Sequence, residues 1–461
     1  MLLNTLFDRF AQNSPVAVMV RGLLEHTLTP EAVDALFEQH ADKQYTRELL
    51  FSQVVEVMSQ VVAGIHPSAN AAYQAQQERL GVSRTAFYDK VNGIEPQVSA
   101  ALLRQSAADL AAVIRQLEAP LPDLLPGYRV KILDGNCLAK TEHRLQELRA
   151  LAAGPLPGKS LVVLDPALML AIDVFPSADG HTQERALLDQ VLPTAEANDV
   201  WIEDRNFCTL GFLFGIAGRG ACFVVRQHQN LPWQAETELE FAGRDEGVEI
   251  WEQKVRLQDP RTGAALVVRR LQLRLSKPTR DGDTVVYVLT NLPARVASAR
   301  VVAQLYRKRW TIETLFQVLV EALQSEQPRL GYPQAALFAF CVALVAYNVL
   351  AVVRAALRAA HGRDKVEAEV STYYLAHEIA GVYQGMMIAL PAEQWERWRR
   401  LTTAQLAALL KELASQARLA AYQRHPRGPK KPRPQRASQK DKPHVSTARL
   451  LAARKKKKPA P

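Results

Sequence analysis

The chain has 461 residues, of which 48% are hydrophobic and 23% charged, a composition typical of a soluble globular protein with two or three domains. The formal net charge of +10 is concentrated at one end. Residues 422–461 hold 14 Lys and Arg against one Asp, whereas the rest of the chain has a balance of −3. The high overall charge is therefore weak support for nucleic-acid binding by the body of the chain, where such a surface must be a local patch.

Cysteine usage and the apolar segments indicate a cytoplasmic protein. The four cysteines have no metal-site spacing, which fits a reduced cytosol, and the N-terminus has no charged-then-apolar signal sequence. Residues 335–353 form an apolar run of 19 residues, long enough to cross a membrane. Its many Ala, Tyr and Cys residues and the lack of a second such run favour a buried core helix. We therefore expect no membrane association.

The first 120 residues are predicted to be helical throughout and to contain a helix-turn-helix. Residues 72–80 would form its first helix, Gly81 its turn, and residues 84–91 its second helix with Ser83 as the N-cap. Residue types that contact phosphates and bases in a major groove would lie on the exposed side of the second helix: Arg84, Thr85, Tyr88 and Lys90. An ordinary helical hairpin has the same pattern, so the DNA-binding interpretation depends mainly on residues downstream.

A proline-rich linker at 120–127 separates these helices from an α/β pattern. The expected elements are strands at 128–138, 160–165, 168–175 and 199–203, with a helix at 184–195, which together predict a mixed sheet. Residues 221–293 are predicted to be β-rich without a helix. Residues 298–326, 335–360 and 365–421 are predicted to be helical, and the basic tail from 422 to be disordered and to bind polyanions.

Within the helix predicted at 298–326, one stripe carries polar groups of mixed charge. By the 3.6-residue period, Tyr306, Arg309 and Glu313 lie in one column beside an apolar stripe. A carboxylate there could hold a divalent metal, and the arginine could hold a phosphate oxygen. A surface helix with an Arg309–Glu313 ion pair, worth a few tenths of a kcal/mol, explains the same spacing. The spacing alone favours this plainer interpretation.

Two aspartates upstream favour the metal-binding interpretation of this stripe over the plain surface helix. Asp134 lies in or at the end of the first predicted strand, and Asp204 follows the strand at 199–203. With Glu313 they give three carboxylates in strand–strand–helix order, which suit two Mg²⁺ ions and an in-line phosphoryl transfer. Asp165 and Asp173 also lie in strands and are alternative ligands. Asp165 precedes Pro166 in a tight turn, where aspartate is common for turn chemistry alone.

Several segments together resemble a DDE transposase of the insertion-sequence-four type. They are residues 133–136 (LDGN), 202–207 (IEDRNF), 223–228 (FVVRQH) and 289–293 (LTNLP), and the spacing Tyr306-x2-Arg309-x3-Glu313. The resemblance runs from about residue 128 to 355 and includes residues 442–446 (KPHVS) of the tail. The tyrosine–arginine–glutamate spacing is its most specific part.

The resemblance implies a fold, an activity and partners. The fold would be α/β: a ribonuclease-H-like catalytic core interrupted by a β-rich insertion, with an all-helical N-terminal domain and a disordered basic C-terminal tail. The domains would be 1–120 (DNA-binding), 128–220 (first part of the core), 221–293 (insertion), 294–421 (second part of the core and C-terminal helices) and 422–461 (tail). The activity would be DNA cleavage and strand transfer with two Mg²⁺ or Mn²⁺ ions. The partners would be double-stranded DNA, as transposon ends and target, and a second copy of the chain, in a bacterial cytoplasm and associated with the nucleoid.

The same resemblance assigns roles to individual residues. Asp134, Asp204 and Glu313 would be the catalytic metal ligands, and Tyr306 and Arg309 would contact terminal DNA phosphates. The family pattern often has a lysine seven residues after the glutamate, where this chain has Val320. Arg226 and His228, which follow a strand near the start of the insertion, are candidates for the missing positive charge, as are Arg307 and Lys308.

Two other classes of protein remain open from the sequence. One is a DNA-binding regulator with an inactive nuclease core, and the other is a metal-dependent nuclease without strand transfer. All three acids are present, which disfavours the inactive core. The tryptophans at 233, 251 and 310 are candidates either for stacking on a base or for the hydrophobic core.

Overall fold

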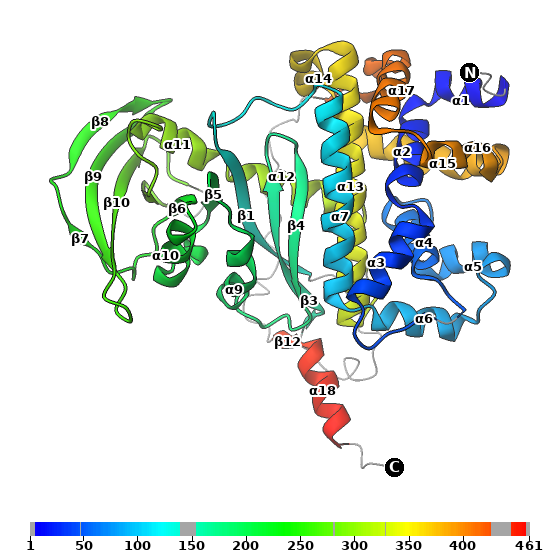
Figure 1. Cartoon of the computed structure of the whole chain (residues 1–461), viewed down its shortest axis with the longest axis horizontal. Coiled ribbons are helices and arrows are strands. Elements are labelled where there is room, and N and C mark those ends of the chain that lie inside the picture. The colour runs from blue at the N-terminus through cyan, green and yellow to red at the C-terminus, as the bar shows by residue number, and fades with distance from the viewer. Residues whose placement is uncertain are drawn as a thin grey trace.

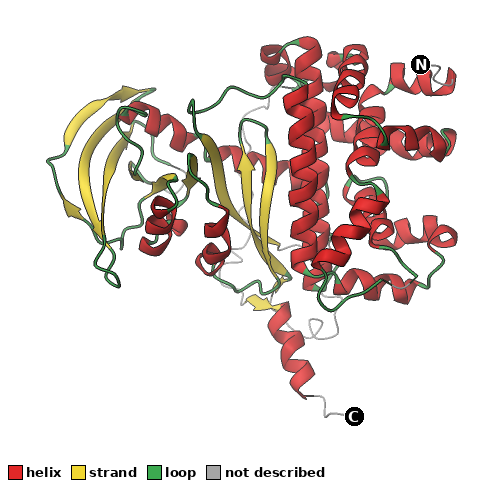
Figure 2. Ribbon diagram, viewed as in Figure 1, coloured by secondary structure: helices red, strands yellow, loops and turns green. Residues whose placement is uncertain are grey.

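A ten-stranded mixed sheet and a bundle of helices lie side by side in the computed structural model (Figures 1 and 2). The structure describes residues 5–46, 48–138, 154–279, 282–327, 329–425 and 444–457. Its architecture confirms the predicted α/β class and the predicted mixed sheet.

The strands of the sheet follow the order β4-β3-β1-β5-β6-β11-β10-β9-β7, with β8 paired to β9. β3 is antiparallel to β1 and to β4, whereas β5 and β6 run parallel to β1. The strands are β1 (Arg129–Leu138), β3 (Gly158–Asp165), β4 (Leu170–Ser177), β5 (Asp199–Glu203), β6 (Cys222–Arg226), β7 (Gln234–Ala235), β8 (Glu240–Asp245), β9 (Val248–Gln258), β10 (Ala265–Leu275) and β11 (Val285–Thr290).

The segment predicted as a β-rich insertion extends this sheet. β6, at the start of the segment, is parallel to β5 and antiparallel to β11, so it belongs to the same sheet as β1. β7 to β11 then continue the sheet outward, at the left of Figure 1. The structure therefore gives no separate β sheet for residues 221–293, and the predicted domain boundaries stay predictions.

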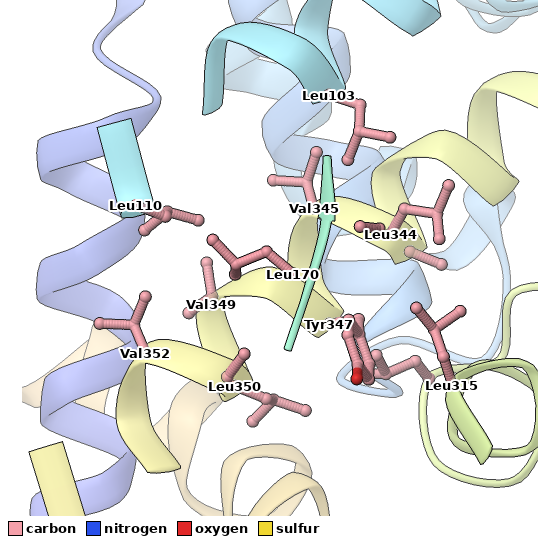
Figure 3. Packing of buried hydrophobic residues seen from close by; sticks show 14 of the residues in the cluster. Leu103, Leu110, Leu170, Leu315, Leu344, Val345, Tyr347, Val349, Leu350 and Val352 are labelled. Atoms are coloured by element: carbon pink, nitrogen blue, oxygen red, sulfur yellow. The ribbon is translucent and has the colours of Figure 1, made fainter. Parts of the chain in front are cut away.

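Helices cover both faces of the inner strands. On one face, Leu133, Trp201 and Phe223 pack with α9 (Leu188–Val191) and α10 (Leu210–Gly218), and α10 was not predicted from the sequence. On the other face, Ile132, Ile202 and Val224 join a large core that includes α7 (Pro96–Gln116) and α13 (Pro333–His361). In that core Leu103 and Leu110 of α7, Leu170 of β4, and Val345, Val349 and Val352 of α13 lie together (Figure 3).

Helices from both ends of the chain share this core. The N-terminal group comprises α1 (Thr5–Asn13), α2 (Pro15–Thr27), α3 (Pro30–His40), α4 (Phe51–Val62), α5 (Ala69–Leu80), α6 (Arg84–Gly93) and α7 (Pro96–Gln116). The C-terminal group comprises α13 (Pro333–His361), α14 (Arg363–Glu369), α15 (Thr372–Ala389), α16 (Ala392–Arg399) and α17 (Thr403–Gln416). Because α13 packs against α2, α4, α6, α7 and α17, the two groups form one helical body.

The apolar run predicted as a core helix lies in α13. Among the described helices, α13 is the one long and apolar enough to cross a membrane, and 94% of its most apolar window is buried inside the protein. Its polar residue Asn348 is fully buried and forms two hydrogen bonds of 2.8 Å with the backbone N–H and C=O of Ala171. These bonds fall where the β3–β4 register shifts, so Asn348 satisfies backbone groups next to the irregularity.

Three predicted elements differ in the structure. The helix expected at 298–326 is two helices, α11 (Ala299–Arg307) and α12 (Trp310–Glu321). The helix expected at 184–195 consists of short pieces, with α9 between two 3₁₀ turns. The tail expected to be disordered contains a strand, β12 (His444–Ser446), and a helix, α18 (Thr447–Lys457), while residues 426–443 lie outside the described residues.

Pairing with a distant segment explains the ordered part of the tail. β12 is parallel to β2 (Gly154–Leu156), and the Arg449 guanidinium donates to Asp179 at 2.7 Å. Ser446 and Thr447 are buried by this contact. The composition of the tail could not reveal a partner strand that lies almost 300 residues earlier in the sequence.

Candidate active site

The register of two parallel strands brings the predicted aspartates together. Leu133 of β1 is paired with Glu203, the last residue of β5. The next residues along the two strands are Asp134 and Asp204, which therefore lie side by side where β5 ends. The carboxylate of Asp204 contributes to the electrostatic environment of Asp134, in agreement with this placement.

Arg309 joins the first aspartate to the predicted glutamate. Its guanidinium donates one hydrogen bond of 3.0 Å to Asp134 Oδ2 and another of 2.9 Å to Glu313 Oε1. The Arg309–Glu313 ion pair expected for an ordinary surface helix is therefore present, but the same guanidinium also binds Asp134. The structure places all three predicted acids around one arginine.

A break between α11 and α12 puts Arg309 in this position. The N–H groups of Lys308, Arg309 and Thr311 bond to carbonyls three residues back, so the backbone tightens into a 3₁₀-like turn. The sequence contains no proline or glycine at this point. Contacts on either side of the break come from other elements, because Arg307 is paired with Asp245 and Arg309 with Asp134.

Tyr306 is buried, whereas the sequence predicted a phenol on the presented face. Its side chain is 5% exposed, and burial raises the pKa of its phenol to about 12. The Tyr306 phenol is also hydrogen-bonded to Arg309. With Glu313 and Trp310 these two residues line one side of a cavity of 580 Å³, whose other side is formed by β10 and β11. Tyr306 is therefore part of the lining of this cavity and not of an exposed face.

The surroundings of Asp134 disfavour the charged form of its carboxyl group. Burial raises its pKa from 3.8 to about 6, the negative charges of Asp204 and Glu184 add to the increase, and Arg309 opposes it. The surroundings of Arg309 instead favour its charged form. Burial by itself lowers the pKa of Arg309, but the neighbouring anions, Asp134 first, raise it overall. The site thus carries more negative charge than one guanidinium neutralises.

Glu184 is an acid at this site that the sequence analysis missed. Its carboxylate lies against Gly135, where an added Cβ would be 2.5 Å from Glu184 Oε1. A glycine directly after Asp134 is therefore what lets this carboxylate approach β1. Asn206 Nδ2 donates to Glu184 Oε2 at 2.9 Å, which links it to the turn that follows Asp204. The motif segments contain Gly135 and Asn206, but nothing local indicates their common neighbour.

Glu203, next to Asp204, is a second unexpected acid. It is fully buried, and neither carboxylate oxygen has a hydrogen-bond partner among the described residues. Burial raises the pKa of Glu203 well above its usual value, because its charged form would have no partner there.

The capacity of this site for metal can be judged from its donors. Carboxylate oxygens are the ligands that Mg²⁺ and Mn²⁺ prefer, and Asp134, Asp204 and Glu313 supply them. Within the part of the chain that the structure describes, however, no three Asp, Glu, His or Cys side chains are grouped closely enough to hold one ion. The donors fit the metal in kind and in charge, while Arg309 bridges two of them.

Of the predicted DNA-contacting residues in the sheet, Arg226 lies beside the acids. It lines the cavity shared with Tyr306, Arg309 and Glu313, and it is paired with Asp283 at 2.6 Å. Arg226 and His228 also line a second cavity, of 690 Å³, next to Arg205. The structure therefore places Arg226 between the acids and a second opening.

The other candidates for the missing charge differ in position. Lys308 lines a different cavity, with Gln304 and Thr311. Arg307 lines the cavity that contains Glu313, but it is bound to Asp245 and Glu246. Val320 is 38% exposed on α12, so it is not a packed core valine. Of the four cations considered, Arg226 and Arg307 line the cavity of Glu313, and His228 lines the neighbouring one.

The helix-turn-helix region has the expected local geometry. Gly81 adopts a left-handed conformation with φ +67° after α5, and the Ser83 hydroxyl accepts from Ala86 N at the start of α6. Arg84 and Thr85 are exposed. Lys90 instead lies over the Phe37 ring at 3.8 Å and donates to the Tyr45 carbonyl. The exposed polar face of α6 is thus smaller than predicted, and α6 lies on the helical half, away from the sheet (Figure 1).

The alternative acids have structural roles. Asp165 Oδ1 accepts hydrogen bonds from the N–H groups of Ala167 and Leu168, as expected for a turn former. Asp173 is paired with Arg104 at 2.5 Å. Asp134 has protein donors too, Arg309 and the Gly135 N–H, but it differs from both in having other carboxylates among the causes of its raised pKa, after burial.

Comparison with known proteins points to one class. Residues 159–349 match the family model for the "Transposase DDE domain", a segment that contains Asp204, Arg226 and Glu313 and begins after Asp134. The Sinorhizobium fredii protein named "Putative transposase y4zB" is 29% identical over 157 residues, which are 34% of this chain and 42% of that protein. Residues 159–349 are therefore similar to a transposase DDE domain, and the chain spans less than half the length of the relative it matches.

A structural comparison adds little to this result. A chain of the cryo-EM structure titled as the piggyBac transposase synaptic complex with hairpin DNA aligns over 88% of this chain and 86% of its own length. The TM-score is 0.40 at 10% identity, a likeness too weak to bear on fold or function.

Proposed function

We propose that this chain is a transposase of the insertion-sequence-four type, which cleaves DNA at the ends of a mobile element and joins them to a target by two-metal phosphoryl transfer. The observation that carries the proposal is the arrangement of Asp134, Asp204 and Glu313 around Arg309. The match to the transposase DDE domain supports the same class of chemistry.

The topology of the inner strands supports a ribonuclease-H-like core. β4, β3 and β1 form an antiparallel meander, and β5 and β6 follow parallel to β1. An acid within the central strand and an acid after its parallel neighbour then meet at one place, and α12 adds the third. We propose that β7 to β11 are the insertion between the second aspartate and the glutamate.

Asp134, Asp204 and Glu313 would hold the metals, with Glu184 close enough to add negative charge. Two Mg²⁺ or Mn²⁺ ions, when bound, supply activation of water or a 3′-hydroxyl and stabilisation of the departing 3′-oxygen. Burial is the main cause of the raised pKa of Asp134, and the negative charges of Asp204 and Glu184 add to it. A divalent cation would neutralise these charges and favour the ionised form of Asp134.

Arg309 would exchange partners when DNA arrives. In the DNA-free chain it neutralises Asp134 and Glu313. A guanidinium binds phosphate with the same planar pair of donors that it uses for carboxylate. Transfer of Arg309, and with it the Tyr306 phenol, to a DNA phosphate would release the oxygens of both acids for metal. Arg226, at the edge of the same cavity, would offer a second phosphate contact.

We further propose that residues 1–120 bind the terminal repeats through Arg84 and Thr85, and that two copies of the chain hold two ends. The protein would act in a bacterial cytoplasm, on nucleoid DNA. The basic tail would add non-specific affinity, with α18 held next to the sheet by β12.

The test is incubation of the purified protein with DNA that carries the sequences flanking its gene, with and without Mg²⁺ or Mn²⁺. We expect metal-dependent breaks at the element's ends, followed by joined products when target DNA is present. Sequencing of the breaks and joints measures both steps.

Two outcomes would identify the other classes of protein. Breaks without joined products would indicate a metal-dependent nuclease, and specific binding without breaks in either metal would indicate a DNA-binding regulator. Either outcome would contradict the proposed transposition.

A further inference from the structure

The 690 Å³ cavity beside the acids has a cationic and aromatic lining, of which the proposed function uses only Arg226 and His228. It lies where β6 ends and β11 begins, and its volume is within the range of about 300–1,000 Å³ typical of ligand sites. The groups that define it are Arg205, Arg226, Gln227, His228, Trp233, Arg270, Asp283 and Tyr287. It shares Arg226 and Val286 with the cavity that contains Glu313, so the two are neighbours.

Arg270 of β10 is the innermost cation of this cavity. Arg270 is only 8% exposed. Its guanidinium carbon lies 4.5 Å from the centre of the Trp233 ring and 3.9 Å from the centre of the Tyr287 ring. Its Nε donates a hydrogen bond of 2.7 Å to Gln227 Oε1. Aromatic faces and a neutral amide stabilise a guanidinium without neutralising its charge.

The charge balance leaves this cation unneutralised. Arg226 is paired with Asp283, the one acid in the lining, at 2.6 Å. Among the described carboxylates none forms an ion pair with Arg270 or Arg205 within 4 Å, in contrast to Arg269, the neighbour of Arg270 on β10, which is paired with Glu252. A buried charge without a counter-ion is costly unless a ligand supplies one. Burial lowers the pKa of Arg270, as expected for such a group.

We propose that this cavity is a binding site for a backbone phosphate of DNA, with Arg270, held by Trp233, Tyr287 and Gln227, as its principal cation. The planar guanidinium offers paired donors that match phosphate oxygens. Because Arg205 follows Asp204 directly and Arg226 lines both cavities, a strand held at the acids can continue over Arg226 to Arg270. This inference rests on the proposed function and names a contact of the same site.

Gln227→Glu is the sharpest variant. The change is isosteric and gives Arg270 a carboxylate partner at the position of the present hydrogen bond. The folded protein should therefore be as stable as the wild type or more so, while the cavity loses its attraction for phosphate. We expect affinity for a 30-base-pair duplex to fall about tenfold in low salt without metal, measured by fluorescence anisotropy.

Arg270→Gln should act in the same direction by removing the charge. The slope of log affinity against log salt should become shallower by about 0.9, the value for one phosphate contact. Arg274→Gln is the matched control, because Arg274 lies on the same strand, stacks on Trp251 at 4.9 Å and does not line the cavity. We expect the control to leave the slope within error of the wild type.

Two results would overturn the site. The first is unchanged affinity and slope in Gln227→Glu. The second is an equal effect of Arg274→Gln, which would show a general loss of charge. Since no cleavage is measured, failure of the proposed function would appear separately, as missing metal-dependent breaks.

Discussion

Asp134 and Arg270 are both charged side chains largely removed from water, but the structure compensates them differently. Asp134 is surrounded by further carboxylates and one shared arginine, and its pKa is raised to about 6. Arg270 lies between two aromatic rings that support its charge without cancelling it. The acidic edge of the sheet therefore lacks positive charge, and the cationic cavity next to it lacks negative charge.

In the proposed complex the two regions would complement each other around a DNA strand. A phosphate would supply the negative charge that the cationic cavity lacks, and a divalent metal would supply the positive charge that the acids lack. Each region by itself costs folding free energy, because isolated buried charges are unfavourable. If the proposals hold, DNA and metal should therefore both stabilise the folded chain.

The largest effect should come from the acids. Replacing Asp134, Asp204 or Glu313 with Ala should reduce cleavage of element ends at least about 1,000-fold, because each change removes a metal ligand from the reacting centre. Binding to end DNA, measured without metal, should be largely retained.

Asp165→Asn is the matched control for these variants. Asp165 accepts hydrogen bonds from two backbone N–H groups in a turn, and the amide oxygen of Asn can still accept them. Its cleavage rate should stay within a few-fold of the wild type. Equal severity would mean that the first metal ligand has been misassigned, and retained cleavage in any alanine variant would remove that residue from the site.

The next largest effect should come from shortening the basic tail, which should lower the affinity for DNA. Deleting residues 447–461 removes α18 and six Lys and Arg while keeping β12 on β2. The salt dependence of binding should flatten by up to about 0.9 for each lost phosphate contact. The preference for end DNA over random DNA should survive, because it is assigned to residues 1–120. Competition binding measures this preference. Its loss would contradict the assignment of end preference to residues 1–120 and of non-specific affinity to the tail.

Substitutions of Arg226 and Lys308 test two of the four candidates for the charge that Val320 does not provide. Arg226→Ala should lower the cleavage rate at low salt by roughly tenfold, because it removes a charge-assisted phosphate contact between the two cavities. Lys308→Ala should have little effect, since Lys308 lines another cavity. If neither change slows cleavage while Val320→Lys increases it, the site is one contact short and Arg226 does not compensate.

The smallest effect should be a gain in stability. The folded-state pKa of Asp134, about 6, lies above its ordinary 3.8, so the folded protein binds this proton more tightly. The stability contributed by the protonated carboxyl is complete below pH 3.8 and is lost as the pH rises through 6.

Asp134→Asn should therefore raise the free energy of unfolding at pH 7 by on the order of 1 kcal/mol, with about 3 kcal/mol as the upper limit set by the shift. At pH 4 the variant and the wild type should be nearly equal. Urea unfolding at both pH values measures this difference. A variant less stable than the wild type at pH 7 would show that the Arg309 contact outweighs the repulsion among the acids.

Local signals determined much of the fold and part of the site. Alternation and turn residues located β1, β3, β4 and β5, and the capping chemistry of Gly81 and Ser83 located α5 and α6. The length and composition of the apolar run predicted α13 as a core helix. The order of Asp134, Asp204 and Glu313 along the chain predicted a shared site. For the two aspartates the physical reason is that side chains at the ends of adjacent parallel strands meet. These features depend on neighbours within a few residues or on one general rule of topology.

Tertiary structure decided the rest, because the interactions that matter join segments far apart in the chain. The break at Lys308 and Arg309 is stabilised by partners in β8 and β1, and Tyr306 is buried beside a cavity that residues of β6, β10 and β11 also line. Glu184 reaches Asp134 only past Gly135, and β12 is ordered only by β2. Desolvation and electrostatic repulsion are sums over all surrounding groups. The raised pKa of Asp134 and the uncompensated charge of Arg270 therefore could not be predicted from the sequence around either residue.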